Sequence, residues 1–452
     1  MVFSSMKTPI TTVVLAAGKG TRMKSPLPKV LHPLLGRPLV SYSLNLCQKI
    51  KAEKILLVTG KDQTLLKEFL KNSKIKNLDI VVQDPPLGTG HAVMMAAKKL
   101  KNFKGDVLII YGDMPLVSYE TIQRLIQEHR TKNSILTFVT APLSRFSQAF
   151  GRVIRDRYGN PVSLVEVRDA TSQQLAINET NVGLYLVSAP FLLESLKQLT
   201  ADNVQQEYYL TDLIKIAAAQ NVTRATIGLE NLAETLGVNT QKEMTWASEL
   251  LSQRKIEELM QNGVRFVTTQ NVVIEPDVFI GADTTIWGPC VLKGKTRIGK
   301  NCTIEPNVVI TDSIIHDAAT IGPFAHLRPG TVLGPSVKVG NFVETKKSNI
   351  KEGAKINHLS YIGDAHIGRH VNIGAGTITC NYDGVNKYKT VLEDNVFVGS
   401  DTQFVAPVRV GQGAFIGAGS TITKNVKPGS LALTRAPQVE IKNWGRKKKR
   451  KG

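Results

Sequence analysis

A glycine-rich loop near the N-terminus has the composition of a phosphate-binding loop. Residues 15–23, LAAGKGTRM, directly follow an apolar run that reads as a β-strand, and glycines at such a point let backbone N–H groups approach an anion closely. A dinucleotide-binding fingerprint is excluded, because its third glycine would fall at Met23 and no acidic residue lies near position 38. A P-loop is excluded because no GK[ST] ends the loop.

Short polar segments recur in the second half of the chain. LRPG (327–330), ETKK (344–347), HLSY (358–361) and CNYDG (380–384) follow one another at intervals of about 15 to 20 residues. His358 heads the third segment, and a neutral imidazole can remove a proton from an amine near neutral pH. One histidine of the eight in the chain is by itself more often structural than catalytic, so His358 gains weight only from the Arg, Lys and Tyr residues of these segments.

The first 230 residues alternate between buried strands and amphipathic helices. This alternation predicts an α/β, Rossmann-like domain with a mostly parallel sheet and ligands at the carboxyl ends of its strands. Asp113 follows one of these strands; taken alone it reads as a helix cap, and beside the glycine loop it reads as a ligand-binding carboxylate. Strands are predicted at residues 10–16, 55–59, 79–82 and 106–111, and helices at residues 91–101 and 118–130.

A helix and then a six-residue repeat follow. Residues 241–261 contain no Gly or Pro and have helical periodicity, which predicts a linker helix. From residue 274 an aliphatic residue returns every six positions, a period that neither a helix nor a hairpin sheet produces but a coil of short strands does. The positions are Ile274, Ile280, Ile286, Leu292, Ile298, Ile304, Ile310, Ile321, Leu327, Leu333, Val339, Ile350, Ile356, Ile362, Ile367, Ile373, Leu392, Val398, Phe404, Val410, Ile416 and Ile422.

The repeat predicts a hexapeptide parallel β-helix with three faces. The period is interrupted near residues 311–320, 344–349 and 379–391, and all three interruptions are predicted to be loops that leave the prism. One coil of three hexads takes about 18 residues, so the four polar segments are expected to stack on one edge. The predicted domains are residues 1–238, a linker helix at 239–262, the β-helix at 263–440 and a basic tail at 441–452.

Composition narrows the cellular setting and the partners. The net charge of +20 favours anionic partners, but the basic tail offers only Trp444 for base stacking, so nucleic-acid binding is not expected. Four scattered cysteines show neither a disulfide framework nor a zinc pattern. No apolar run reaches about 18 residues and the N-terminus has no cleavage signal. We therefore expect a cytoplasmic protein without stable membrane association.

Further motifs accompany the glycine loop: LPKV (27–30), Gln83 ahead of LGTGH (87–91), and YGDMP (111–115). Together they resemble the sugar-1-phosphate nucleotidyltransferases. From about residue 10 to residue 440 the chain resembles the bifunctional N-acetylglucosamine-1-phosphate uridyltransferase/glucosamine-1-phosphate acetyltransferase family.

That resemblance implies acetyl transfer from acetyl-CoA to glucosamine-1-phosphate, then uridyl transfer from UTP, giving UDP-N-acetylglucosamine for peptidoglycan and lipopolysaccharide synthesis. In the first domain it implies UTP binding by Leu15, Ala16, Ala17, Gly18, Arg22, Lys29, Gln83, Gly88 and Thr89, with Lys29 also catalytic. It implies binding of the acetamido sugar by Gly151, Glu166 and Asn181, and Mg²⁺ held by Asp113 and by Asn239 of the GVN motif at 237–239.

In the β-helix the resemblance implies a left-handed coil, a homotrimer, and His358 as the base, assisted by Glu344 and Asn381. No serine or cysteine is placed for a covalent acyl intermediate, so direct transfer is expected. Glucosamine-1-phosphate would contact Arg328, Lys346, Tyr361 and Asn372, and acetyl-CoA would contact Ala375, Asn381, Tyr382, Ser400, Ala418 and Arg435; Lys387 has no assigned role.

Two alternatives share this layout. One is another sugar-nucleotide synthase whose hexapeptide domain is regulatory, and the other is a non-catalytic regulatory subunit. The pairing of His358 with Asn381 argues against the first, and the presence of Lys29, Asp113, Asn239 and His358 together argues against the second.

Overall fold

The computed structural model describes residues 8–62, 64–73 and 75–445 of the 452-residue chain. Residues 446–451, the basic end of the tail, lie outside the described residues. Contacts divide the chain into two compact units, Met1–Leu251 and Ser252–Gly452, which are considered one at a time. No helix among the described residues is both long and apolar enough to cross a lipid bilayer.

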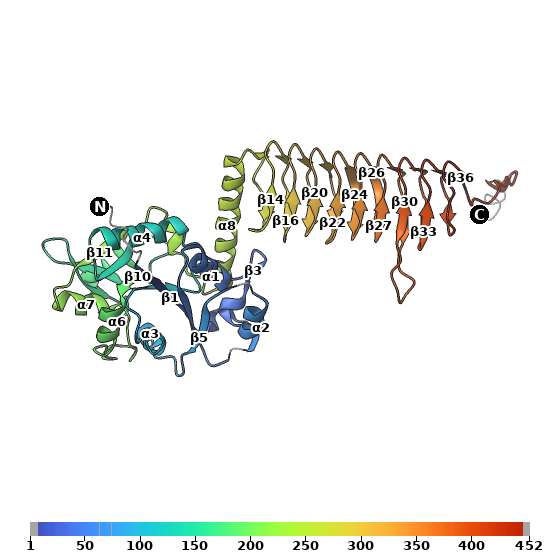
Figure 1. Ribbon diagram of the computed structural model, residues 1–452. Coiled ribbons are helices and arrows are strands. Elements are labelled where there is room, and N and C mark those ends of the chain that lie inside the picture. Colours follow the sequence, from blue (N-terminus) through green and yellow to red (C-terminus); the bar gives the residue numbers. More distant parts are fainter. Residues whose placement is uncertain (1–7, 63, 74, 446–452) are drawn as a thin grey trace, which may run out of the picture. The chain divides into compact units, whose positions relative to one another are not determined.

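The first unit is built on a twisted, mostly parallel sheet with helices on both faces (Figure 1). Its central strands are buried along nearly their whole length, because each faces helices on both sides. β10 runs antiparallel to β6 and β7. In spatial order the strands are β11 (Arg224–Gly228), β7 (Leu136–Pro142), β10 (Glu179–Ser188), β6 (Asp106–Tyr111), β1 (Ile10–Ala16), β4 (Lys54–Thr59) and β5 (Leu78–Val82), with β8 (Arg152–Arg155) and β9 (Pro161–Val165) paired at the side.

The four strands predicted from the sequence are present at the predicted places, which confirms the α/β fold. The helix predicted at 91–101 differs: α3 spans Thr89–Ala97, because Gly90 N–H donates to the Tyr208 carbonyl at its start and tight turns replace the helix after Ala97. The remaining helices are η1 (Thr21–Met23), η2 (Lys29–Leu31), α1 (Val40–Lys49), α2 (Thr64–Asn72), α4 (Tyr119–Thr131), α5 (Ser172–Leu175), α6 (Ala189–Leu196), α7 (Asp212–Ala219) and η3 (Leu232–Thr235), and a small ribbon joins β2 (Pro33–Leu34) to β3 (Arg37–Pro38).

Helix α8 (Gln241–Gln261) occupies the residues that the periodicity predicts as a helix. The boundary between the units falls inside it. Met244 and Ala247 pack in a core cluster of the first unit with Met23 and Val238, whereas Ile256 and neighbouring residues join the core of the second unit. Each half of α8 is therefore part of the unit that it packs against.

The second unit is a parallel β-helix, as the six-residue period predicts (Figure 1). The aliphatic residues that recur every six positions point inward and form one continuous core. The first face holds β12 (Arg265–Phe266), β15 (Thr285–Ile286), β18 (Thr303–Ile304), β21 (Thr320–Ile321), the start of β24 (Lys338–Lys346) and of β26 (Lys355–Gly363), β28 (Asn372–Ile373), β31 (Phe397–Val398), β34 (Phe415–Ile416) and β36 (Leu431–Ala432).

Two further faces complete the prism. The second holds β13 (Val272–Ile274), β16 (Cys290–Lys293), β19 (Val308–Thr311), β22 (His326–Leu327), the ends of β24 and β26, β29 (Ile378–Cys380), β32 (Gln403–Val405) and β35 (Thr421–Ile422). The third holds β14 (Phe279–Ile280), β17 (Arg297–Ile298), β20 (Ile314–Ile315), β23 (Val332–Leu333), β25 (Asn349–Ile350), β27 (Ala365–Ile367), β30 (Thr390–Leu392) and β33 (Val408–Val410).

Two of the three predicted loops are wrong. Near 311–320 and 344–349 the chain stays in the wall, and the coil is only shorter by one residue at the corner between the second and third faces, as the pairing of Arg297 with Ile314 shows. The six-residue period of aliphatic residues is interrupted at positions 345 and 379 because buried threonines stand there instead. Their hydroxyl groups form hydrogen bonds inside the prism. In the third interruption, residues 381–389 do leave the prism: Cys380 and Thr390 are still paired in the wall, and the chain between them forms a protruding loop at the same corner.

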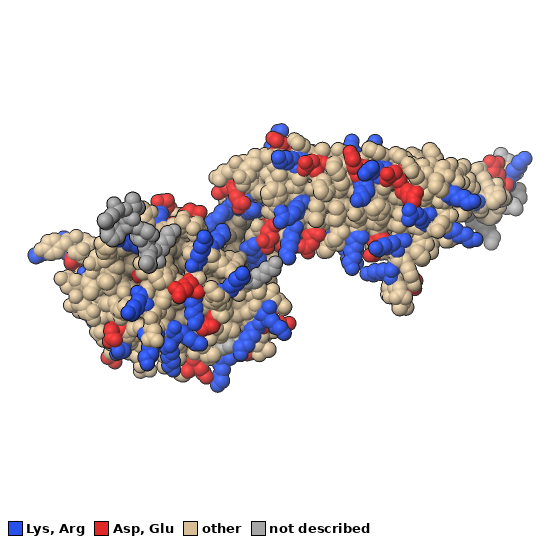
Figure 2. Space-filling model, viewed as in Figure 1, with Lys and Arg blue, Asp and Glu red and all other residues tan. Residues whose placement is uncertain are grey.

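Figure 2 shows Lys and Arg side chains spread over the visible face of both units. Asp and Glu side chains lie among them. On this face the excess positive charge is therefore not gathered in a single groove.

Candidate functional site

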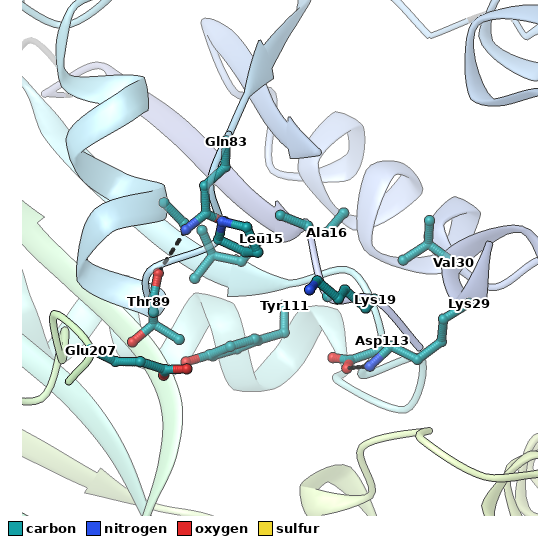
Figure 3. Close-up of a pocket in the computed structure, with 15 residues that line it drawn as sticks. Leu15, Ala16, Lys19, Lys29, Val30, Gln83, Thr89, Tyr111, Asp113 and Glu207 are labelled. Carbon is teal, nitrogen blue, oxygen red and sulfur yellow. Dashed lines mark hydrogen bonds and ion pairs between the residues drawn. The ribbon is translucent and has the colours of Figure 1, made fainter. Parts of the chain in front are cut away.

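The first candidate site lies at the carboxyl end of the parallel strands. Leu15 of β1 pairs with Tyr111 of β6, and Gly112 N–H donates to the Leu15 carbonyl at 2.8 Å. This register brings the glycine loop after β1 beside Asp113 after β6. Between them is a cavity of about 460 Å³, lined by both segments (Figure 3).

The glycine loop closes tightly over Lys29. Gly20 has a φ of +64°, and a Cβ there would lie 2.7 Å from the Cβ of Lys29. A larger residue at this position would push the lysine away. Lys29 begins η2 and is 8% exposed, so the loop delivers a nearly buried ammonium group to the cavity.

That ammonium group joins the two predicted metal ligands. Lys29 Nζ forms an ion pair with Asp113 and donates to Asn239 Oδ1 at 2.9 Å. Asn239 arrives there from far along the chain because Val238 N–H donates to the Asp113 carbonyl at 2.9 Å. The Asp113 and Asn239 oxygens thus converge on one point of the size that a single cation occupies.

A divalent cation fits this point. Among the described residues no three His, Cys, Asp or Glu side chains come together as a metal site, so a metal here would depend on one carboxylate, one amide and other oxygens. Mg²⁺ is usually held in this way, by one or two carboxylates together with substrate phosphates and water.

The opposite wall of the cavity presents a polar edge. Gln83 is 4% exposed, and its Nε2 donates to the Gly88 carbonyl at 2.9 Å. Gly88 has a φ of +96°, and a Cβ there would approach the Tyr208 carbonyl oxygen to 2.7 Å. Thr89 Oγ1 accepts from Leu210 N–H. In Figure 3 Gln83 and Thr89 lie across the cavity from Lys29 and Asp113, with Tyr111 between them.

A second cavity of about 630 Å³ adjoins the first, and Thr89, Tyr111, Asp113 and Glu207 line both. It is more acidic. Burial raises the pKa of Glu166, and the nearby Asp169 raises it further, whereas Thr211 Oγ1 donates to its carboxylate and opposes the shift.

The second cavity also places Gly151 against Glu166. A Cβ on Gly151 would lie 3.5 Å from Glu166 Oε2. Asn181 is held by hydrogen bonds to Tyr185 and Gly183 at a bulge of β10.

Every residue of the first unit that the sequence nominated lines one of these cavities. Lys19, Tyr111 and Glu207 also line the first cavity and were missed; Tyr111 and Lys19 stand inside recognised motifs, whereas Glu207 belongs to a loop without a motif. Burial raises the pKa of Tyr111, so its hydroxyl group stays neutral. The second cavity adds Arg168, Gln205, Tyr209 and Thr211.

In the second unit, His358 lies at the edge between the first and second faces. Its Nδ1 lies 3.1 Å from Asn341 Oδ1, an acceptor, and this contact suits the neutral tautomer that carries its proton on Nδ1. Counting two residues beyond the paired positions Ile356, Ile373, Val398 and Ile416 gives one column along this edge: His358, Ala375, Ser400 and Ala418.

Arg435 continues this column, because it lies beside the backbone of Gly417 and Gly419. The proposed acetyl-CoA residues Ala375, Ser400, Ala418 and Arg435 are thus brought into line with His358.

A cluster of basic residues lies at the next edge, between the second and third faces. Arg328 Nη1 donates to Glu344 Oε1 at 2.6 Å. The positive charges of Lys387 and then Arg328 lower the pKa of Lys346. These three cations have only one adjacent carboxylate, so a bound anion would reduce their mutual repulsion.

Asn381 Nδ2 donates to the Asp364 carboxylate in the same corner. Tyr361 pairs with Glu344 on the second face, and the ring of Tyr382 lies exposed on the protruding loop.

The expectation of one edge is therefore wrong within a single chain. His358 belongs to one edge, the cluster around Arg328 and Lys346 to the next, and Asn372 to the first face. The error comes from counting each interval between polar segments as one coil: a coil here takes 17 residues, and it carries Glu344 to Tyr361 and Asn341 to His358. The same spacing of 17 would have found the missed residues Asn341 and Asp364, each one coil before His358 and Asn381.

Comparison with known proteins covers the whole chain. A MobA-like NTP transferase domain matches residues 12–211, a hexapeptide repeat of succinyl-transferase matches residues 271–312, and a GMPPB C-terminal domain matches residues 309–410. These matches agree with an α/β transferase domain followed by a left-handed parallel β-helix.

Curated relatives extend over nearly the full length. The bifunctional protein GlmU of Geotalea uraniireducens is 45% identical over 97% of this chain and 99% of its own. That of Thermotoga maritima is also 45% identical, with the same coverage. That of Syntrophotalea carbinolica is 46% identical over 96% of each chain. Two site-bearing units in one order, with identity of this extent across both, show that the chain belongs to the family of bifunctional GlmU proteins.

Proposed function

We propose that the protein makes UDP-N-acetylglucosamine in two steps: acetyl transfer from acetyl-CoA to glucosamine-1-phosphate in the β-helix, then uridyl transfer from UTP to the product in the α/β unit. The observation that carries this proposal is full-length membership of a bifunctional family, in a chain whose nominated residues line two joined cavities. The product would supply peptidoglycan and lipopolysaccharide synthesis, and its UTP and acetyl-CoA substrates place the reaction in the cytoplasm.

For uridyl transfer, the first cavity takes UTP and the second takes the acetamido sugar phosphate. The uracil would meet Gln83, Gly88 and Thr89, and the phosphates would meet the loop at 15–22 and Lys29. Gly151, Glu166 and Asn181 would bind the sugar. The two cavities meet at Asp113, which is where the attacking sugar phosphate and the α-phosphorus would have to meet.

This step needs no side-chain base. A sugar phosphate is already an anionic nucleophile, so its oxygen can attack the α-phosphorus in line while pyrophosphate leaves, and the protein must align the groups and neutralise charge. Mg²⁺ held by Asp113, Asn239 and phosphate oxygens would supply a second centre of positive charge. Lys29, which is buried against Asp113 and Asn239, would bind the phosphates with its ammonium group.

For acetyl transfer, His358 would remove the proton from the glucosamine amine, which then attacks the thioester carbonyl and displaces CoA. The Asn341 contact at Nδ1 would orient the ring, so that Nε2 of the neutral imidazole could accept this proton. Glu344 and Asn381 would orient the substrates. An extended acetyl-CoA lying along the edge from His358 past Ala375 and Ser400 to Ala418 would span about 14 Å over three coils.

The sugar phosphate of this step would bind at the cluster of basic residues, with Arg328, Lys346, Tyr361 and Asn372 as its partners. Because that cluster and His358 lie on different edges of one prism, a complete site requires a second copy of the chain. We therefore include a homotrimer in the proposal. Phe324 and Phe342 lie on the His358 edge. Their rings are stacked with centroids 5.3 Å apart and are about half exposed, so they give this edge an apolar surface on which a second chain could pack.

Product analysis tests the proposal. The full-length protein is given glucosamine-1-phosphate, acetyl-CoA, UTP and Mg²⁺, and mass spectra are taken with each component omitted in turn. We expect N-acetylglucosamine-1-phosphate without UTP, and UDP-N-acetylglucosamine only in the complete mixture. Uridyl transfer without acetyl transfer would favour a synthase with a regulatory β-helix, and the absence of both products would favour a non-catalytic subunit.

A further inference from the structure

Helix α8 contributes directly to the first unit before it reaches the second. Thr240 and Glu243 form its first turn: Glu243 Oε2 accepts from Asn239 N–H at 2.7 Å and from Thr240 N–H at 2.8 Å. The carboxylate at this position satisfies backbone donors at the helix start and fixes the residue that reaches Lys29. The first turn of α8 therefore holds Asn239 in place in the proposed uridyl-transfer site.

One turn further on, α8 carries Trp246, which belongs to an aromatic clamp formed by Arg145, Phe146, Lys242 and Trp246. The Phe146 and Trp246 rings meet edge to face, with centroids 5.9 Å apart and planes at 70°. The Arg145 guanidinium lies 4.6 Å from the Phe146 centroid, and the Lys242 ammonium lies 4.8 Å from that of Trp246. Both geometries are attractive: edge to face for the rings, and a cation over each ring face.

The clamp holds a segment that enters the second cavity. Residues 144–150 connect β7 to β8, and Ala149, Phe150 and Gly151 line the cavity beside Glu166. The hydrogen bonds described for residues 144–150 go to members of the segment or to its neighbours Pro142 and Arg152. The segment is thus fastened to α8 by side chains: Phe146 packs on Trp246, and the Arg145 guanidinium lies 5.9 Å from the Trp246 centroid.

We propose that Trp246 is a positioning residue for the sugar substrate: by clamping Phe146 it fixes residues 149–151 at the distance from Glu166 that the acetamido sugar requires. The proposal rests on the proposed uridyl transfer and deepens it. Glu207 and Thr89 line both cavities, but Ala149, Phe150 and Gly151 line only the second. The effect of the clamp should therefore fall on the sugar phosphate and not on UTP.

The test measures steady-state uridyl transfer with each substrate varied separately. Trp246→Ala is expected to raise the KM for N-acetylglucosamine-1-phosphate roughly threefold to tenfold, the range of one aromatic contact. The KM for UTP and kcat should stay within about twofold, because binding in ground and transition states is lost equally. Trp246→Phe should restore the KM, and Thr245→Ala, an exposed neighbour on α8, should behave as wild type. Phe146→Ala should match Trp246→Ala, and the double variant should add little.

The calorimetric melting transition of the first unit, measured on the same preparations, reports its folding, and Phe146→Ala carries the test if Trp246→Ala fails to fold. An unchanged KM for the sugar phosphate in a folded Trp246→Ala protein would overturn the clamp, as would an equal rise in the KM for UTP or no rescue by phenylalanine. If instead wild type forms no UDP-sugar, the proposed function itself fails, a result that is distinct from all of these.

Discussion

The two units present their chemistry in opposite ways. In the α/β unit, Asp113, Asn239 and Lys29 come from distant parts of the chain and meet where two cavities adjoin. In the β-helix, His358 and the cluster around Lys346 stand on open edges, held only by the register of the coils. The difference supports the proposed homotrimer: the residues proposed for the first site meet within one chain, whereas those proposed for the second lie on two separate edges of it.

The largest expected effect is on His358. His358→Ala should lower acetyl transfer by on the order of 10²- to 10⁴-fold, the contribution of a general base. Uridyl transfer should be nearly unchanged, because no residue of the β-helix lines either cavity of the first unit. Separate assays of the two reactions on one preparation check this. Loss of both activities in a folded protein would mean that the units share a site.

Asp113→Ala is the reciprocal change, and it should lower uridyl transfer by about 10²- to 10³-fold, because the loss of one preorganised charged group costs this much. Lys29→Ala should act in the same direction. Acetyl transfer provides the control and should persist in both variants. Normal UDP-N-acetylglucosamine formation by both would remove Asp113 and Lys29 from the mechanism.

The open edge makes a different prediction. Phe342→Glu should place a charge in the stacked pair with Phe324, dissociate the trimer and reduce acetyl transfer at least tenfold, while uridyl transfer continues. Sedimentation and both assays measure this. Tyr158→Glu, a change at an exposed aromatic residue of the first unit, is the matched control. A Phe342→Glu protein that acetylates normally as a monomer would show that one chain suffices.

The smallest effect concerns stability. Burial raises the pKa of Glu166 in the folded state, so the folded protein holds its proton more tightly than the unfolded chain. The free energy of unfolding therefore falls as pH rises from the ordinary pKa of a glutamate to the raised pKa of Glu166 in the folded protein. Glu166→Gln should raise the melting temperature of the first unit by a few degrees at pH 8, and the gain should shrink toward pH 5. Calorimetry at several pH values tests the sign; a constant difference would contradict it.

The sequence predicted where helices and strands lie along the chain better than it predicted which distant segments come together. Local apolar patterns were enough to predict the strands that begin at residues 10 and 106 and the helix at 241–261. The position of Asn239 beside Asp113 depends on one long-range backbone hydrogen bond, and only the family resemblance pointed to it. Glu207 and Trp246 lie in segments whose importance arises from packing, which leaves no local pattern.

In the β-helix, the fold followed from the six-residue period, but the edges did not. The polar segments follow one another at intervals that are not whole coils, so His358 stacks on Asn341 and not on Glu344, and the buried Thr345 concealed where each face begins. The proposed limits of the domains at 238, 262 and 440 stay a prediction.

The irregularities at one corner of the prism bear on how such a protein can change. The coils shortened by one residue and the insertion at 379–391 both occur between the second and third faces, and neither shifts the pairing of the coils that follow. Insertions and deletions at the corner between the second and third faces therefore leave the position of the His358 edge unchanged. Val385, 83% exposed at the loop, marks a point where a foreign peptide or reporter could be grafted without displacing the coils.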